Sequence, residues 1–98
     1  MRLPSLILAT FLLFGFQSFS QVVEECFSEY VVSSWIDRVD ICVDGVGLGS
    51  MRMVLDTGRE YIYYEVDLST YWEFVEASSP GEFFNYNIRN RYDYARLK

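Results

Sequence analysis

The sequence predicts an α+β fold, in which a three-stranded antiparallel sheet is followed by two helices packed on one face. Two observations predict this fold. Apolar and polar residues alternate over residues 39–44 and 50–55 with the period of half-buried strands, and a tyrosine-rich β pattern follows at 60–65. After Val66, apolar residues recur at helical spacing, and a second helix start follows at residue 79.

The first twenty residues are typical of a secretory signal peptide. Arg2 supplies a positive charge, and residues 6–16 form an apolar run. Ser18 and Ser20 are small residues placed three and one before a cleavage site. The apolar run is well short of the ~20 residues that cross a bilayer, so an uncleaved anchor is the weaker alternative. We expect cleavage after Ser20, no stable membrane anchor afterwards, and a secreted or periplasmic protein of one small domain.

Residues 21–32 read as an N-terminal extension that forms an extra short helix or an edge strand. This segment contains Cys26, and Cys42 is the second of the two cysteines in the chain. An isolated pair in an oxidising compartment predicts one disulfide, with two buried free thiols as the alternative. The disulfide would tie the extension to the domain expected over residues 33–98.

Composition excludes several kinds of chemistry. The chain has no histidine, which rules out metal sites built on imidazole and His-based catalytic triads. We therefore expect no metal and no cofactor. The net charge of −6 disfavours contact with nucleic acids and anionic membranes. Positive charge is concentrated near the C-terminus, at Arg89, Arg91, Arg96 and Lys98.

The three predicted strands are residues 39–44, 50–55 and 60–65. The glycine-rich stretch at 45–49 leads into a strand, whereas a phosphate-binding loop would lead into a helix, so we interpret it as a strand connection. Between the second and third strands, Gly58 tolerates the positive φ that a tight turn needs.

The turn before the third strand contains Asp56-Thr57-Gly58, the triplet that carries the catalytic aspartate of aspartic proteases. That chemistry needs two aspartates sharing a proton, and this chain has one copy of the triplet. We interpret Asp56 as the corner of a hairpin and expect no enzymatic activity.

The first predicted helix follows Val66 and has Leu68, Trp72 and Val75 on its apolar face, with Asp67 or Ser69 as N-cap. The second helix begins with Ser79-Pro80-Gly81-Glu82, a capping box with proline at the first helical position.

In the second helix, Phe84 and Ile88 form the apolar face. Asn85, Arg89 and Tyr92 are spaced to share another face, and Arg89 and Arg91 are expected in the last turn.

The chain from Ser33 to Leu97 resembles the KTSC domain, a short module named from the C-terminus of some lysyl-tRNA synthetases. The resemblance is carried by Ser33-Ser34, Ile36, Gly58, Tyr61-Ile62-Tyr63, Val66, Ala77, Ser79-Pro80-Gly81, Phe84-Asn85, Ile88-Arg89 and Tyr92. Asp67 departs from the family pattern, which usually has proline there. The resemblance implies a fold; the family's activity is not established, and RNA binding is the usual suggestion.

We expect a non-enzymatic interaction module whose site is Tyr61 and Tyr63 beside Asn85, Arg89 and Tyr92. The partner would be an unknown protein or small ligand. In the structural alternative, the two tyrosines are core residues and Arg89 pairs with a neighbouring carboxylate.

The alternative function is RNA binding, with Tyr61 and Tyr63 stacking on bases and the C-terminal basic residues contacting phosphates. The acidic net charge argues against it.

Overall fold

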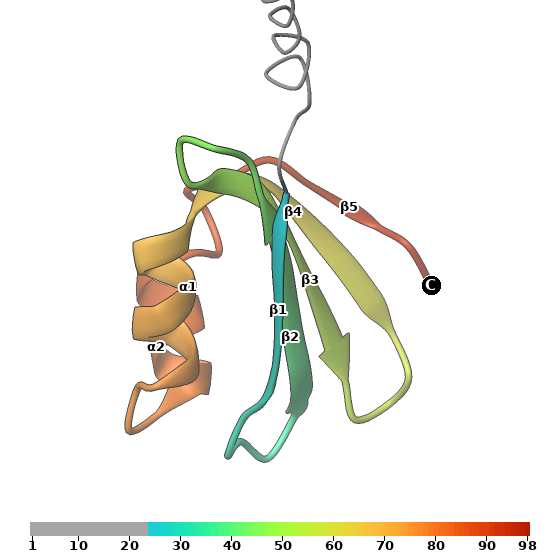
Figure 1. Ribbon diagram of the computed structural model, residues 1–98. Coiled ribbons are helices and arrows are strands. Elements are labelled where there is room, and N and C mark those ends of the chain that lie inside the picture. The colour runs from blue at the N-terminus through green and yellow to red at the C-terminus, as the bar shows by residue number, and fades with distance from the viewer. Residues whose placement is uncertain (1–23) are drawn as a thin grey trace, which may run out of the picture.

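The structure is a computed structural model that describes residues 24–98, so the predicted signal peptide lies outside the described residues. Five antiparallel strands form one sheet in the order β1-β2-β3-β4-β5. They are β1 (Glu25–Tyr30), β2 (Ile36–Val43), β3 (Leu48–Leu55), β4 (Glu60–Asp67) and β5 (Tyr94–Arg96). Helices α1 (Leu68–Val75) and α2 (Pro80–Asn87) lie together on one face of the sheet (Figure 1). The predicted α+β fold with two helices is confirmed.

The predicted count of three strands is wrong: β5 was not predicted, and β1 was given only as one of two alternatives for the N-terminal extension. In β1 only Phe27 is partly buried and every other residue is exposed, so no alternation marks it. β5 is three residues long and follows the helices, pairing with Tyr61–Tyr63 of β4. Edge strands bury less side-chain surface than central strands, and their periodicity is correspondingly weak.

The central strands follow the predicted alternation. Val39, Ile41 and Val43 of β2 are at most 1% exposed, and Met51 and Met53 lie beside them on β3. These side chains face the helices and form the core with a group from the other elements. That group is Ile36, Tyr63, Val66, Tyr71, Phe74, Phe84 and Ile88.

A β-bulge lets β4 contribute one more residue to the core. Gly49 pairs with Val66 and Met51 with Tyr63, so Tyr64 and Glu65 together face a single residue of β3. Glu65 takes a left-handed φ of 56° there. The extra residue shifts the alternation by one position and turns Val66 to the buried face.

The glycine-rich stretch is the β2–β3 hairpin connection, as predicted. The Asp44 carboxylate accepts hydrogen bonds from the backbone N–H groups of Val46 and Leu48. Gly47 supplies a positive φ of 83°. At Gly49, an added Cβ would lie 1.8 Å from the carbonyl oxygen of Cys42, so only glycine fits this close approach of two strands.

Helix α1 begins after Asp67, one of the two predicted caps. The Asp67 carboxylate accepts hydrogen bonds from the hydroxyls of Ser69 at 2.6 Å and Thr70 at 2.7 Å, and no cap bond to a backbone N–H is formed. The buried face centres on Tyr71 and Phe74, which are 0% exposed. The predicted face of Leu68, Trp72 and Val75 is only partly buried and flanks this centre.

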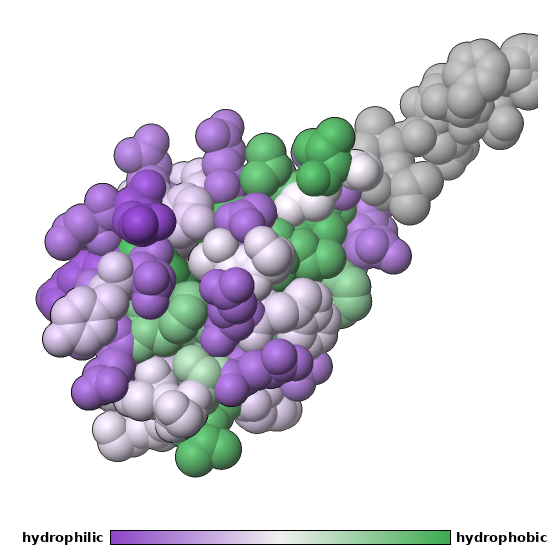
Figure 2. Space-filling model, turned by 90° about the vertical axis from the view of Figure 1, so that its left-hand side faces the viewer, coloured by the Kyte–Doolittle hydropathy of each residue, from purple (hydrophilic) through white to green (hydrophobic). Residues whose placement is uncertain are grey.

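Helix α2 starts where the motif predicts, with Ser79 at the N-cap and Pro80 in the first turn. The side-chain hydrogen bond of a capping box is absent. Phe84 and Ile88 are buried as predicted. On the helix side of the molecule, hydrophilic residues are interspersed with small apolar areas (Figure 2). Within residues 24–98, neither helix is long and apolar enough to cross a membrane.

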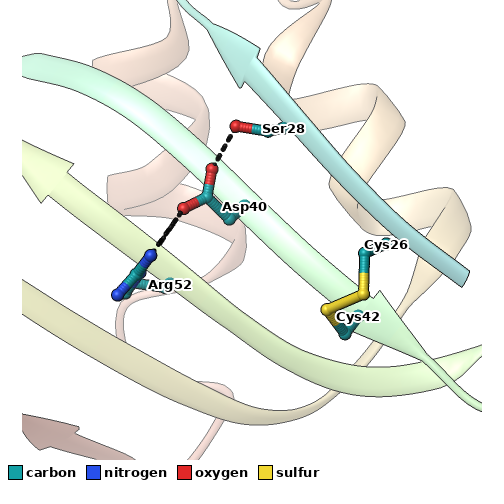
Figure 3. The surroundings of a disulfide bond; sticks show 5 residues. All are labelled: Cys26, Ser28, Asp40, Cys42 and Arg52. Atoms are coloured by element: carbon teal, nitrogen blue, oxygen red, sulfur yellow. Dashed lines mark hydrogen bonds and ion pairs between the residues drawn. A yellow bond between two sulfur atoms is a disulfide. The ribbon is translucent and has the colours of Figure 1, made fainter. Parts of the chain in front are cut away.

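The predicted disulfide joins Cys26 of β1 to Cys42 of β2, directly opposite one another in the sheet (Figure 3). Next to it, Asp40 accepts a hydrogen bond from the Ser28 hydroxyl and pairs with Arg52 of β3 at 3.3 Å. The extension therefore adds an edge strand that is held covalently and by a polar cross-strand row.

Candidate binding site

A cavity of about 420 Å³ opens between α2 and the β3–β4–β5 side of the sheet. Its lining comes from the segment before β2, from strands β3, β4 and β5, and from α2 with the residues that follow it. The lining residues are Trp35, Met53, Leu55, Tyr61, Tyr63, Phe84, Asn85, Arg89, Asn90 and Tyr94. Four of the five residues predicted to form the site are among them, because β4 and α2 face one another across this space.

Aromatic rings follow one another around the cavity. Trp35 meets Phe84 edge-on with ring centroids 5.6 Å apart, and Phe84 meets Tyr63 edge-on at 5.7 Å. Tyr63 stacks on Tyr94 at 5.4 Å, and Tyr94 contacts Tyr61 at 6.2 Å. These separations lie in the range of favourable aromatic pairs. The result is a continuous row of aromatic rings contributed by the segment before β2, by strands β4 and β5, and by helix α2.

Two small residues that carry the family resemblance, Ser33 and Gly81, position Trp35 at the cavity. The Ser33 hydroxyl accepts hydrogen bonds from the backbone N–H groups of Trp35 and Ile36, which fixes the bend before β2. A Cβ at Gly81 would lie 2.6 Å from the indole nitrogen of Trp35. Gly81 thus provides the room in which the indole lies against the start of α2.

Tyr63 is a core residue with 5% of its surface exposed, whereas Tyr61 is partly buried. Burial raises the pKa of Tyr63 to about 12, with a further increase from Tyr94 and Tyr61 and a partial decrease from Arg89. The hydroxyl is therefore protonated at neutral pH. No hydrogen bond joins it to another residue within 24–98, whereas the equally buried Tyr71 donates to the Val39 carbonyl oxygen at 3.0 Å.

Asn85 and Arg89 lie at the exposed rim of the cavity. Arg89 Nη1 donates a hydrogen bond to Asn85 Oδ1 at 3.2 Å. Among the described residues, the ion pairs are made by Arg38, Arg52 and Lys98, and none involves Arg89. The alternative in which Arg89 pairs with a carboxylate is not seen in this part of the chain.

Tyr92 does not join the other predicted site residues. Its spacing predicts a place on the face of α2 that carries Asn85 and Arg89, but α2 ends at Asn87. Arg89 and Arg91 consequently lie beyond the helix, and its last turn has no basic residue. The Tyr92 hydroxyl instead donates to Asp67 Oδ1 at 3.2 Å, which ties the segment after α2 to the start of α1.

The remaining basic residues lie apart from the cavity lining. Arg91 lines a separate hollow with Tyr64, Glu65, Tyr92 and Asp93. Lys98 is 3.8 Å from a carboxylate oxygen of Glu60. Tyr63 is thus too buried to offer a ring face for stacking on a base, and Arg91, Arg96 and Lys98 are not among the residues that line the cavity.

The Asp-Thr-Gly triplet and the group of Glu24 with the two cysteines both lie outside the cavity lining. Asp56 is exposed in the β3–β4 turn, where Leu55 N–H donates to the Arg59 carbonyl at 2.9 Å and Gly58 has a φ of 92°. Glu24, Cys26 and Cys42 are the grouping of potential metal ligands within residues 24–98, and the two sulfurs are joined to one another.

Sequence reasoning missed several lining residues, foremost Trp35 and Tyr94. Trp35 follows Ser33-Ser34, which already carried the family resemblance, and its position could have been weighed from that motif. Tyr94 lies in the missed strand β5, and no local signal identifies it.

The fold and cavity define a small α+β module built on a five-stranded antiparallel meander. Residues 49–92 match the model of the KTSC domain, which confirms the predicted resemblance over that part of the chain. The crystal structure of a KTSC domain protein from Yersinia pestis has the same fold, with a TM-score of 0.60 and 23% sequence identity over 76% of this chain and 100% of that chain. No curated protein matches the chain significantly.

Proposed function

We propose that this KTSC domain protein is a non-enzymatic binding module that holds a ligand, or a ligand group of a partner protein, in the aromatic cavity. The observation that carries the proposal is the convergence of five aromatic rings on one cavity of about 420 Å³ with polar side chains at its rim. This volume lies in the range of small-ligand sites, and the lining offers aromatic surfaces together with the polar groups of Asn85, Arg89 and Asn90.

The lining of the cavity favours binding over chemistry. It contains no carboxylate, thiol or imidazole that could act as a base or a nucleophile. Asp56 lies in a turn and is not among the lining residues. We favour this function over RNA binding because base stacking requires an exposed ring face, and Tyr63 is 5% exposed.

The proposal includes a secreted or periplasmic location. It is supported by the signal-peptide pattern of residues 1–20 and by the disulfide between Cys26 and Cys42, which persists in oxidising compartments.

The test uses Trp35 as a reporter of the cavity. Trp35 and Trp72 are the two tryptophans of the chain, and Trp72 contacts Phe27 and Tyr71 away from the cavity. In a Trp72→Phe background, small-molecule and protein fractions of a host extract are titrated while the Trp35 indole N–H resonance is followed by NMR. A fraction that shifts the resonance supports the proposal if Asn85→Phe, which narrows the rim, abolishes the shift.

The matched control is Tyr86→Phe, a substitution on α2 at a side chain that is 81% exposed and outside the cavity. It should leave the response unchanged. If no fraction shifts the resonance, or if Asn85→Phe responds as the background does, the cavity is not the binding site.

A further inference from the structure

We propose that the ligand of the aromatic cavity is a monoanion, a carboxylate attached to a flat apolar group, whose oxygens are held by Arg89 and by the Tyr63 hydroxyl. This inference rests on the proposed function and specifies the chemical class that the site takes. The carboxylate can belong to a small aromatic acid or to the C-terminal residue of a peptide.

The charge of the lining selects an anion. Arg89 is the one charged side chain among the residues that line the cavity. Arg89 makes no ion pair with a carboxylate of the described residues, so its charge is not neutralised within this part of the chain. Asn85 occupies one guanidinium N–H, so several of its five donors are available to a ligand.

One positive charge matches one negative charge. A cation would be repelled by Arg89 even though aromatic rings attract cations in other proteins. A carboxylate also fits the planar guanidinium in geometry, because the two can form parallel N–H···O bonds.

The floor of the cavity provides a second donor. The Tyr63 side chain is 5% exposed, and its hydroxyl is protonated at neutral pH and makes no hydrogen bond to a residue within 24–98. A buried hydroxyl without a partner is costly, and nearly all such groups in folded proteins are satisfied. A ligand carboxylate oxygen would accept its hydrogen bond.

Arg89 and Tyr63 present their donors to the same cavity. Both residues line the same cavity, and the guanidinium charge is felt at the Tyr63 hydroxyl. Tyr61, Tyr94 and Trp35 surround them with ring surfaces, which favour a flat apolar body over a branched or strongly hydrated one.

The experiment measures the affinity of defined probes by Trp35 fluorescence in the Trp72→Phe chain at pH 7. Benzoate and 4-hydroxyphenylacetate represent small acids, and a short peptide ending in phenylalanine with a free carboxylate represents the peptide source. Benzamide, benzylamine and the same peptide with an amidated end are the neutral and cationic counterparts. We expect the carboxylates of at least one source to bind at least 10-fold more tightly than their counterparts.

Two substitutions test the assigned groups. Arg89→Gln is expected to weaken carboxylate binding at least 10-fold and to leave the weak benzamide signal unchanged, whereas its control Arg91→Gln removes the same charge outside the cavity without effect. Tyr63→Phe is expected to weaken binding several-fold, and Tyr86→Phe is its control. Circular dichroism verifies that each variant is folded.

Equal binding of benzoate and benzamide, or unchanged affinity in Arg89→Gln, would overturn the assignment of a carboxylate. If no probe binds while an extract fraction still shifts Trp35 in an Asn85-dependent manner, the carboxylate class is wrong and the cavity remains the site. If neither probes nor extract act on Trp35, both proposals fail.

Discussion

The same substitution at two buried tyrosines is expected to change the stability of this domain in opposite directions. Tyr71 is 0% exposed, and its hydroxyl donates a hydrogen bond to the Val39 carbonyl oxygen. Tyr63 is 5% exposed, and its hydroxyl makes no hydrogen bond to a residue within 24–98. A phenylalanine at either position removes one oxygen and keeps the ring contacts, so the difference between the variants isolates the hydrogen bond.

The magnitudes follow from what each oxygen does. Loss of the Tyr71 hydroxyl deletes a hydrogen bond and leaves a buried carbonyl with one partner fewer, so Tyr71→Phe should lower the free energy of unfolding by about 1–2 kcal/mol. Loss of the Tyr63 hydroxyl removes a buried polar group without a partner, so Tyr63→Phe should raise the free energy of unfolding by about 0–1 kcal/mol.

Urea denaturation of the ligand-free protein, followed by circular dichroism, measures both changes. In a domain of this size, 1 kcal/mol also corresponds to about 4–8 °C in Tm. If Tyr63→Phe loses as much stability as Tyr71→Phe, the Tyr63 hydroxyl has a partner in the folded protein. The reasoning that makes this hydroxyl available to a ligand would then be refuted.

Alkaline unfolding gives a second readout of Tyr63. Burial raises its pKa to about 12 in the folded protein, above the value of about 10 for an unfolded chain. The folded state therefore binds this proton more tightly, and the resulting stabilisation is fully present below pH 10 and is lost as the pH rises through 12. Tyr63→Phe should make the decline in stability between pH 10 and 12 shallower, and a decline of unchanged slope would contradict the assignment.

Reduction of the disulfide is expected to lower the free energy of unfolding by about 3 kcal/mol, the loop-closure value for a loop of this approximate length, as measured by urea unfolding with and without reductant. Gly49→Ala should cost about 3 kcal/mol or more, because its Cβ would lie 1.8 Å from the Cys42 carbonyl oxygen, whereas Gly45→Ala meets nothing within 4 Å and should melt like the parent. Burial raises the pKa of Asp40, but hydrogen bonds from Ser28 and from neighbouring arginines outweigh burial and hold it below its usual value. The stability that Asp40 contributes is thus present above about pH 4 and lost at lower pH, so the Asn variant should show a smaller difference between urea midpoints at pH 3 and pH 7.

The parts of the fold that were predictable from the sequence are those in which burial repeats at a regular interval. Strands β2 and β3 alternate because one face packs on the helices, and α2 begins at a proline whose missing N–H suits a first turn. β1 and β5 lack such a signal because they lie at the edges and bury few side chains. Both strands form by pairing with β2 and β4, and such long-range pairing leaves no local pattern in the sequence.

The error at Tyr92 has a related cause. Spacing of i, i+4 and i+7 describes one face only while the helix continues, and nothing in the residues after Phe84 marks the end of α2 with a glycine or a proline. The helix ends at Asn87, and the segment beyond it turns so that the Tyr92 hydroxyl reaches Asp67. Asp67, which stands where the family usually has proline, therefore accepts a hydrogen bond from Tyr92, the residue that was wrongly predicted to lie on the face of α2.

The cavity depends on two small residues that position Trp35 without lining the cavity themselves. Ser33 bends the chain before β2, and Gly81 leaves room for the Trp35 indole at the start of α2. Both carry the KTSC resemblance, as do Tyr61 and Tyr63 on the opposite wall. The Asp-Thr-Gly turn, which looks most like catalytic chemistry in the sequence, lies outside the lining. Residues of the family motif thus converge on the walls of one aromatic cavity, and this convergence is the main support for the ligand-binding role proposed above.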